Sequence, residues 1–308
     1  MPPHSGNRMV APAQARRVQS PGALKTLRVG LATLQTILTV SPRSSFTMHT
    51  RLALFVLLVE SLVARGIPAP ASPNGGTHRT PNVRSAGGII NHCVVPGVVA
   101  LTFDDGPYVY TNHVLDLLDQ HKAKATFFVN GDNYAHNIDD PSSPWFGVLK
   151  RMIGSGHQIG SHTWSHVDLS AAASETRRQE VQTLEQALVR IIGKAPTYLR
   201  PPYASCSSEC LSDMEQLGYR VVNFDADTLD YLHQQPGEIQ GAINNFAAAF
   251  DSVKPNRGSI LVLSHDVHQQ TAEALVPFML KSIEEAGYKA VTVGECLGDP
   301  ADNWYRSL

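Results

Sequence analysis

Acidic side chains are almost missing from the first 90 residues of this 308-residue chain. Glu60 is the only acid there, against 10 lysines and arginines, so residues 1–90 carry a net charge of +9. Residues 91–308 carry −11, and an asymmetry of this kind often separates a targeting segment or tail from a folded domain. The acidic excess of the second part argues against nucleic acid as a partner, because phosphate binding needs clustered lysine and arginine.

The basic part also lacks an apolar run long enough to cross a bilayer. Its run Leu52–Val59 is too short for that, but it follows Met48 and Arg51 and precedes small residues. This is the order of a secretory signal peptide, which we predict over residues 48–66. Glu60 interrupts the run, and a buried helix is the alternative. A chain processed in this way is secreted to the extracellular space or the cell wall.

The other segment boundaries follow from composition. Residues 1–47 contain no acid and no sustained period, so we expect a disordered extension upstream of the true start of the protein. Residues 67–90 are rich in proline, glycine and serine, which predicts a flexible linker. Residues 91–297 then form one domain, and residues 298–308 form a C-terminal tail. Since that tail has no hydrophobic segment, we expect no membrane anchor once the signal is removed.

Cysteine is scarce as well, with four in the chain. An even number in a secreted protein predicts two disulfides, for which three pairings exist. Cys93 and Cys296 bracket the domain, so a bond between them would join its two ends, whereas Cys206 and Cys210 could close a small loop. A zinc site with four thiolate ligands is the alternative, but the chain lacks the paired C-x-x-C spacing typical of one.

From residue 97 onward, short apolar runs alternate with helical patterns, of which the clearest are Val114–His121, Val181–Ile192 and Leu275–Ile283. This alternation is typical of a parallel α/β fold, either an open sheet or a barrel, whose sites gather at the carboxyl ends of the strands. Glycines that follow the helices predict left-handed C-caps. The seven predicted strands are Val98–Phe103, Ala125–Val129, Gln158–Ser161, Tyr198–Arg200, Arg220–Phe224, Ser259–Ser264 and Ala290–Val293.

Two adjacent carboxylates, Asp104 and Asp105, follow the first predicted strand in T-F-D-D-G-P. Like charges this close reduce stability unless a cation or a proton relieves them. Alternating side-chain directions would let one carboxylate bind a metal while the other faces a substrate water. The alternative is a plain turn, because aspartate, glycine and proline all favour turns.

Two histidines, His162 and His166, follow the third predicted strand in H-T-W-S-H. Their four-residue spacing would place both imidazoles on one face of a helical turn, which is a common way to hold zinc. Two histidines and one aspartate provide three protein ligands. They leave a position open for water or substrate, as a catalytic zinc ion requires.

Polar groups also follow the later strands. Arg200, at the end of the fourth, could pair with a carboxylate, and the two prolines after it make the N–H of Tyr203 a candidate oxyanion donor. A surface arginine followed by a rigid turn is the alternative. Asp230 lies beyond the fifth strand. His265 follows the sixth, where a histidine with a carboxylate partner can act as a general acid.

Together, the segments T-F-D-D-G-P, H-T-W-S-H, R-P-P-Y, D-T-L-D-Y and L-S-H-D resemble, in this order, the five motifs of the polysaccharide deacetylase family, carbohydrate esterase family 4. The resemblance covers roughly residues 91–297. It implies a distorted (β/α) barrel, commonly of seven parallel strands, and metal-dependent removal of N- or O-acetyl groups from polysaccharides. The flanking cysteines and the ending V-T-V-G-E-C-L-G-D are similar to those of secreted fungal chitin deacetylases.

For the metal site, the resemblance implies that Asp105, His162 and His166 bind zinc or another divalent ion such as cobalt. Tyr231 stands where the family usually has tryptophan, so the wall beside the acetyl group is expected to differ slightly. Leu263 is expected to line the acetyl pocket.

For proton transfer, the resemblance implies that Asp104 is the general base, oriented by Arg200, and that His265 is the general acid, tuned by Asp230. The backbone N–H of Tyr203 would stabilise the oxyanion. None of these residues is missing, which argues against a catalytically inactive wall-binding protein.

The expected substrate is chitin or a chitooligosaccharide, whose N-acetylglucosamine units would yield chitosan and acetate. Acetylated xylan and the N-acetylglucosamine of peptidoglycan are the alternatives, because the same metal chemistry serves all three. We expect the working protein to be a monomer.

Overall fold

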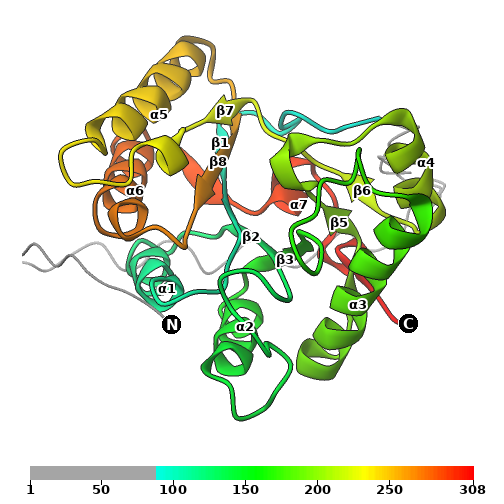
Figure 1. Cartoon of the computed structure of the whole chain (residues 1–308). Helices are drawn as coiled ribbons and strands as arrows, with labels where there is room; N and C mark the ends of the chain where they lie inside the picture. The colour runs from blue at the N-terminus through cyan, green and yellow to red at the C-terminus, as the bar shows by residue number, and fades with distance from the viewer. Residues whose placement is uncertain (1–87) are drawn as a thin grey trace, which may run out of the picture. The chain divides into compact units, whose positions relative to one another are not determined.

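The computed structural model describes residues 88–308. The expected extension 1–47, the signal peptide 48–66 and the linker up to residue 87 lie outside the described residues. Within the described part, a sheet of parallel strands is surrounded by helices (Figure 1). None of those helices is both long enough and apolar enough to span a membrane.

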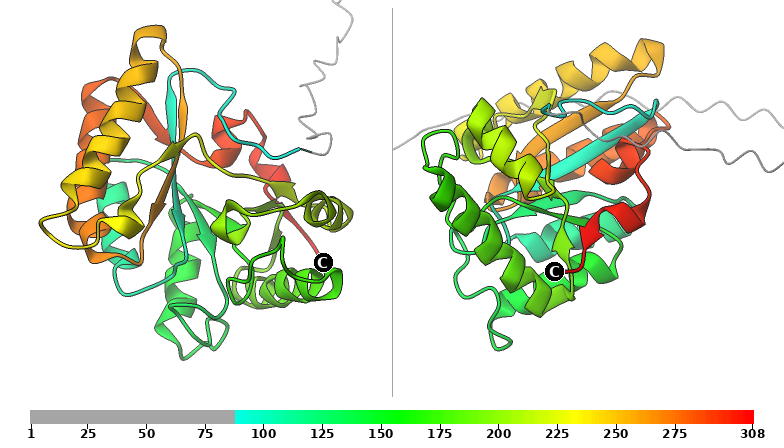
Figure 2. Two further views of the ribbon diagram at one scale, coloured as in Figure 1. Left: turned by 45° about the horizontal axis from the view of Figure 1, so that its top comes forward. Right: turned by 90° about the vertical axis from the view of Figure 1, so that its right-hand side faces the viewer.

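Seven strands follow one another across the sheet in the order β6-β5-β3-β2-β1-β8-β7, and β9 also pairs with β1. All these pairings are parallel, and the sheet curls as it passes through them (Figure 2). The expected distorted (β/α) barrel is therefore confirmed. The strands of this sheet are β1 Val98–Asp104, β2 Thr126–Val129, β3 Gln158–Ser161, β5 Tyr198–Leu199, β6 Arg220–Val221, β7 Ala226–Asp227, β8 Ile260–His265 and β9 Lys289–Val291.

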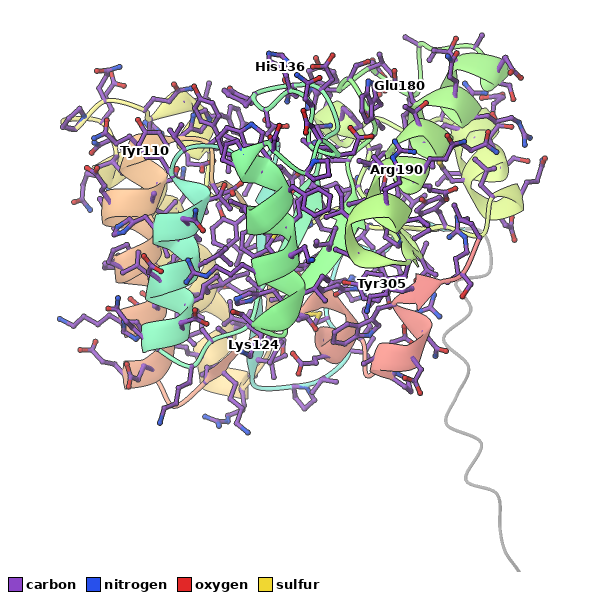
Figure 3. The ribbon with its side chains drawn as sticks, turned by 90° about the horizontal axis from the view of Figure 1, so that it is seen from below. Tyr110, Lys124, His136, Glu180, Arg190 and Tyr305 are labelled. Carbon is purple, nitrogen blue, oxygen red and sulfur yellow. A yellow bond between two sulfur atoms is a disulfide. The ribbon has the colours of Figure 1, made fainter. Side chains whose placement is uncertain are left out.

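Parallel strands need long connections, and the helices supply them. Their apolar faces and alternate strand residues form the main core between helices and sheet, filled by the side chains drawn in Figure 3. The helices are α1 Thr111–Gln120, α2 Pro144–Gly154, α3 Ser174–Ile192, α4 Ser208–Gln216, α5 Gln240–Val253, α6 Val276–Glu285 and α7 Val293–Cys296. Shorter helical turns are η1 Pro202–Ala204, η2 Asp230–Leu232, η3 Lys254–Asn256, η4 Thr271–Leu275 and η5 Ala301–Asn303.

Strand β1 shows how the sequence directs side chains to the two sides of the sheet. All of its residues are buried. Leu101 and Phe103 pack with the helices in the main core, whereas Ala100 belongs to a second apolar cluster inside the curl. Because side chains alternate along a strand, Thr102 and Asp104 also face the inside of the curl.

The segment after α7 is folded onto the domain. Its strand β10 (Tyr305–Arg306) pairs antiparallel with β4 (Ala195–Pro196), and the Tyr305 hydroxyl accepts a hydrogen bond from the Ile159 N–H at 2.8 Å (Figure 3). Trp304 lies so close to α7 that a Cβ atom on Gly294 would come within 2.0 Å of its indole nitrogen. Residues expected to form a tail after position 297 thus pack against the barrel.

Several local expectations can be compared with the structure. All seven predicted strand runs coincide with strands, although the two-residue strands β4, β7 and β10 were not predicted. Both disulfides favoured by the cysteine positions, Cys93–Cys296 and Cys206–Cys210, are present. The glycines after α3, α4 and α6, namely Gly193, Gly218 and Gly287, have the expected left-handed backbone, with φ of 75°, 77° and 66°.

Candidate active site

The carboxyl ends of the parallel strands meet at one end of the barrel, where the candidate residues gather. Asp104 and His265 are the last residues of β1 and β8, and the pairing of these strands places them opposite each other. His162 follows β3 and Arg200 follows β5, and the backbone N–H of each donates to the neighbouring strand. Backbone pairing therefore brings these four residues to one place.

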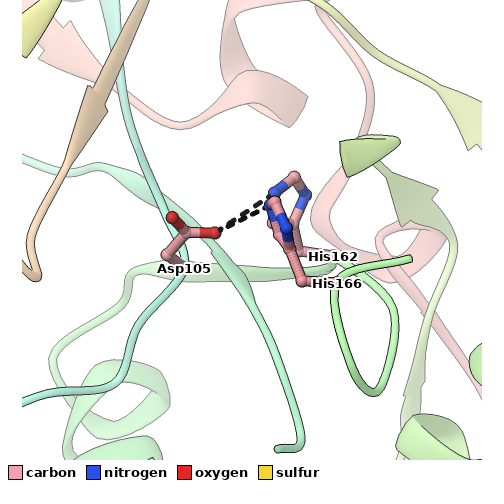
Figure 4. Close-up of side chains that lie close together, drawn as sticks. All are labelled: Asp105, His162 and His166. Carbon is pink, nitrogen blue, oxygen red and sulfur yellow. Dashed lines mark ion pairs between the residues drawn. The ribbon is translucent and has the colours of Figure 1, made fainter. Parts of the chain in front are cut away.

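Three potential metal ligands converge beside Asp104 (Figure 4). The Oδ1 atom of Asp105 lies 3.5 Å from Nε2 of His162 and 3.2 Å from Nε2 of His166. Ligand atoms around a tetrahedral zinc ion, each about 2.1 Å from the metal, lie roughly 3.4 Å apart. The Asp105 oxygen is buried and has no hydrogen-bond partner within residues 88–308, as expected of an atom that a cation would satisfy. The donor set fits a divalent metal ion.

The charge states of these groups suit a metal. Burial raises the pKa of Asp105, but the close approach of His166 and the nearby charges of His162 and His265 outweigh it and lower that pKa to about 2. Burial also lowers the pKa of His162, which favours its neutral form. Its Nδ1 atom lies 2.7 Å from the carbonyl oxygen of Arg200 and can donate to it, which leaves the Nε2 lone pair for a metal.

His162 and His166 do not lie on a helical turn, so the expected helical pair is wrong. The segment between them has no regular secondary structure, and Thr163 and His166 have left-handed φ angles of 70° and 59°. The Thr163 hydroxyl accepts from the His166 N–H at 3.1 Å. The N–H and hydroxyl of Ser165 both donate to Glu180 of α3 at 2.7 Å. Tertiary hydrogen bonds, rather than helix periodicity, bring the two imidazoles together.

Asp104 is paired with a buried arginine. Its Oδ1 atom accepts a hydrogen bond from Arg200 at 2.9 Å, and its Oδ2 atom lies 3.9 Å from Nε2 of His162. The guanidinium group of Arg200 also donates to two backbone carbonyl groups and lies over the ring of Phe128, with 4.3 Å to the centroid. One carboxylate oxygen of Asp104 is therefore fixed, and the other lies next to the metal ligands.

His265 is paired with a buried carboxylate. Asp230, in η2, accepts hydrogen bonds from Nδ1 of His265 at 2.7 Å, from the His265 N–H at 2.8 Å and from the Thr271 hydroxyl at 2.7 Å. Burial lowers the pKa of His265, but the charge of Asp230 and its hydrogen bond outweigh this and raise the pKa to about 9. The imidazole is therefore protonated at neutral pH, and its Nε2 atom can donate a proton.

The three candidate substrate contacts border these pairs. Tyr203 has a left-handed φ of 59°, and its N–H has no acceptor among the described residues. Its ring packs edge-on against His166, with 4.7 Å between centroids. Tyr231 stands edge-on to His265 at 5.5 Å. Leu263 precedes His265 by two residues on β8, so both side chains leave the same side of that strand.

Three buried polar residues support the site without having been given a role from the sequence. The Asn130 N–H donates to the carbonyl of Gly106 at 3.0 Å, and its side chain donates to the loop of the two histidines. Thr271 holds Asp230, as described above, and Asp266 receives a hydrogen bond from α1. Asn130 directly follows a predicted strand, so attention to polar residues at strand ends would have found it.

Comparison with known proteins shows the family to which this chain belongs. A model of the polysaccharide deacetylase family matches residues 91–222. A chitin deacetylase of Colletotrichum lindemuthianum is 42% identical over 245 residues, which cover 79% of this chain and 97% of that protein. The chain therefore belongs to the polysaccharide deacetylase family.

Within that family, the similar proteins include further chitin deacetylases. One from Pestalotiopsis sp. is 47% identical over 221 residues, which cover 72% of this chain and 70% of that protein. The solved structure of the chitin deacetylase from Colletotrichum lindemuthianum matches with a TM-score of 0.68 at 42% identity. It covers 71% of this chain and 96% of that chain. The likeness extends over nearly the whole of that relative.

Proposed function

We propose that this protein hydrolyses the N-acetyl groups of N-acetylglucosamine units in chitin or chitooligosaccharides, giving chitosan and acetate. The observation that carries the proposal is the pairing of Asp104 with His265 on neighbouring strands, beside the ligand cluster at Asp105. Amide hydrolysis needs a base for the attacking water and an acid for the leaving nitrogen. The choice of chitin is supported by the two relatives, both of which are chitin deacetylases.

Asp104 is the proposed general base. Arg200 holds its Oδ1 atom, so its Oδ2 atom is the one that accepts a proton from the attacking water. Arg200 keeps its own proton at any working pH and favours the ionised form of its partner. It therefore acts as a positioning residue for Asp104.

His265 is the proposed general acid. Cleavage of the carbon–nitrogen bond leaves an amine that must gain a proton, and the Nε2 atom of His265 supplies it while Nδ1 stays bound to Asp230. Asp230 keeps the imidazole charged until that step. An ionised base combined with a protonated acid predicts a bell-shaped pH profile.

The acetyl carbonyl oxygen gains negative charge as the water adds to its carbon. The unengaged N–H of Tyr203 is the proposed donor to this oxyanion, because backbone N–H groups held in place by the fold stabilise such a charge without reorganisation. Tyr231 and Leu263 are proposed to border the acetyl group, since both lie next to His265.

Asp105, His162 and His166 are proposed to hold a zinc ion or another divalent ion such as cobalt. When bound there, the ion would act as a Lewis acid that lowers the pKa of water and polarises the acetyl carbonyl. Three protein ligands would leave a position on the ion open for water or substrate.

We further propose that the protein works outside the cell as a monomer, after removal of the signal at residues 48–66. The two disulfides support the extracellular location, because such bonds persist in oxidising compartments. N-terminal sequencing of the secreted protein tests the processing. A mature chain that begins before residue 48 would contradict it.

The substrate is tested by mass spectrometry of the products from defined chitin oligomers, with and without a chelator. We expect acetate release that the chelator abolishes, matched by loss of acetyl groups from the sugar. Acetylated xylan and peptidoglycan fragments are assayed in parallel. Activity confined to either of them would reject chitin as the substrate, and zinc binding without activity on any of the three would indicate a wall-binding protein.

A further inference from the structure

The residue that follows His265, Asp266, carries a carboxyl oxygen without a hydrogen-bond partner among the described residues. Asp266 is fully buried, and its Oδ1 atom has no hydrogen-bond partner among residues 88–308. A buried polar atom without a partner is unfavourable, and it calls for an explanation in a folded protein. None of the steps proposed above uses this carboxyl group.

The Asp266 carboxyl group lies against the turn that carries Asp105. A Cβ atom built on Gly106 would lie 2.6 Å and 2.7 Å from the two carboxyl oxygens, and these are the nearest atoms it would meet. Gly106 is not among the glycines with a left-handed φ, so its backbone conformation does not by itself require glycine. The close approach of Asp266 leaves no room for a Cβ atom unless its carboxyl group shifts.

Asp266 is itself held in place. The Thr111 hydroxyl, at the start of α1, donates to one of its oxygens and accepts from the Tyr108 N–H at 2.8 Å. On the other flank, the carbonyl of Gly106 accepts from the Asn130 N–H at 3.0 Å. The turn that follows β1 thus contacts residues that follow β2 and β8, and the residue after β8 is in turn hydrogen-bonded to α1.

We propose that Asp266 is a positioning residue for the metal site. Its carboxyl group, oriented by Thr111, packs on Gly106 and sets the direction in which Asp105 is presented to the two histidines. An apolar side chain of similar volume would avoid the unpaired oxygen, but it could not be held by the Thr111 hydroxyl. The inference rests on the proposed metal site and is independent of the substrate.

A double-mutant cycle tests this contact with zinc affinity as the readout. Gly106→Ala, Asp266→Ala and the double variant are compared with the full secreted protein by titration of zinc against a competing chelator. We expect Gly106→Ala to raise the zinc Kd by roughly 10- to 100-fold, the range found for residues that orient metal ligands. In the Asp266→Ala background, the same glycine substitution should change the Kd by less than about threefold, because the clash is gone.

The conservative variant Asp266→Asn shows whether the shape of the Asp266 side chain or its charge matters for zinc binding. It keeps an acceptor for Thr111 and the volume that packs on Gly106, so its zinc Kd should stay within about threefold of wild type, whereas Asp266→Ala should weaken binding by about tenfold. This comparison also decides the proposal if Gly106→Ala fails to fold. Asp213→Ala, which removes a buried ion pair with Arg177, is the control: it should lower the Tm and leave the zinc Kd unchanged.

Failure of the proposed metal site and failure of the proposed role of Asp266 would give different results. A wild-type protein that binds no zinc would overturn the proposed metal site itself. If the wild type binds zinc but Gly106→Ala weakens binding equally in both backgrounds, Asp266 is not what requires the glycine. If Asp266→Ala binds zinc as tightly as wild type, Asp266 does not position Asp105, whatever the enzyme does to chitin.

Discussion

The site contains two buried ion pairs: Asp104 with Arg200, here called the base side, and His265 with Asp230, the acid side. They differ in which charge belongs to the group that is proposed to react. On the base side the cation, Arg200, supports a carboxylate that is proposed to react. On the acid side the carboxylate, Asp230, supports an imidazolium that is proposed to react. The supporting side chains are 1% and 0% exposed, whereas Asp104 and His265 are 4% and 13% exposed. In each pair, the group proposed to react is the less buried one.

This difference shows how one environment can serve two opposite charge states. Burial alone favours the neutral form of both an aspartate and a histidine. A fixed partner of opposite sign reverses that preference, and the sign of the partner decides whether the site holds an anion or a cation. The two pairs lie side by side because β1 and β8 are neighbours.

Asp104→Asn tests the base side and should have the largest effect. We expect kcat for acetate release to fall by about 10³-fold, because general bases contribute roughly 10²- to 10⁴-fold, while the zinc content stays that of wild type. Asp116→Asn, an exposed aspartate paired with Arg151 on α2, is the matched control and should keep full activity. Measurable turnover near the wild-type rate would exclude Asp104 as the base.

Asp230→Asn tests the acid side and should have the next largest effect. Loss of the Asp230 charge lowers the pKa of His265, which the structure holds at about 9, so the alkaline limb of the kcat profile should move to lower pH by more than about one unit. At the optimum of the wild type, kcat should fall by about 10²-fold. Asp227→Asn, at the end of β7 and not bonded to His265, should leave the limb in place. An unmoved limb in Asp230→Asn would mean that another group sets it.

The same pair predicts how stability depends on pH in the metal-free protein. The folded pKa of His265 is raised from 6.5 to about 9, so its stabilisation is complete below about pH 6.5 and is lost as the pH rises through 9. The Tm of Asp230→Asn should therefore lie roughly 10 °C below wild type at pH 6, and this gap should narrow toward pH 10. Thermal unfolding in chelator at several pH values measures the gap. A gap that widens with pH would contradict the assigned charge state.

The two sides also differ in that a disulfide lies close to only one of them in the sequence, and its removal should have a smaller effect. The disulfide Cys206–Cys210 lies just after Tyr203 on the base side, and among residues 88–308 no disulfide lies next to His265. Replacing both cysteines by serine should lower the free energy of unfolding by about 2 kcal/mol, as loop entropy predicts for so short a loop. Urea denaturation measures this change. The alkaline limb of the pH profile should not move, and a moved limb would show that the bridge acts on the acid side as well.

Much of the fold could be predicted because hydrophobic periodicity sets it. Most of the strand runs are rich in apolar residues and bounded by turns, so all seven were visible in the sequence. Strands β4, β7 and β10 were not, because two residues make no run. Helices α2, α5 and α7 were also missed. In α5 the buried positions (Ala242, Phe246 and Phe250) are too few among alanines and asparagines to give a clear period.

The candidate site was predictable to the extent that its residues follow strands. That rule identified five site residues: Asp104, Asp105, His162, Arg200 and His265. It could not give the conformation of the histidine loop, because the left-handed φ angles at Thr163 and His166 depend on bonds such as those to Glu180 of α3. Nor could it show that Asp266 packs on Gly106, since that contact exists only once β8 and β1 are paired.

The ladder between β1 and β8 has a consequence for design. Asp104 and His265 lie opposite each other in the ladder, so backbone hydrogen bonds between the two strands set their separation, and no loop does. We therefore expect that a surrounding loop, such as residues 132–143, can be exchanged for that of a relative without changing the spacing of the two proton-transfer groups. An engineer who wants this domain to accept a different polymer can replace such a loop and keep the spacing of the proposed base and acid.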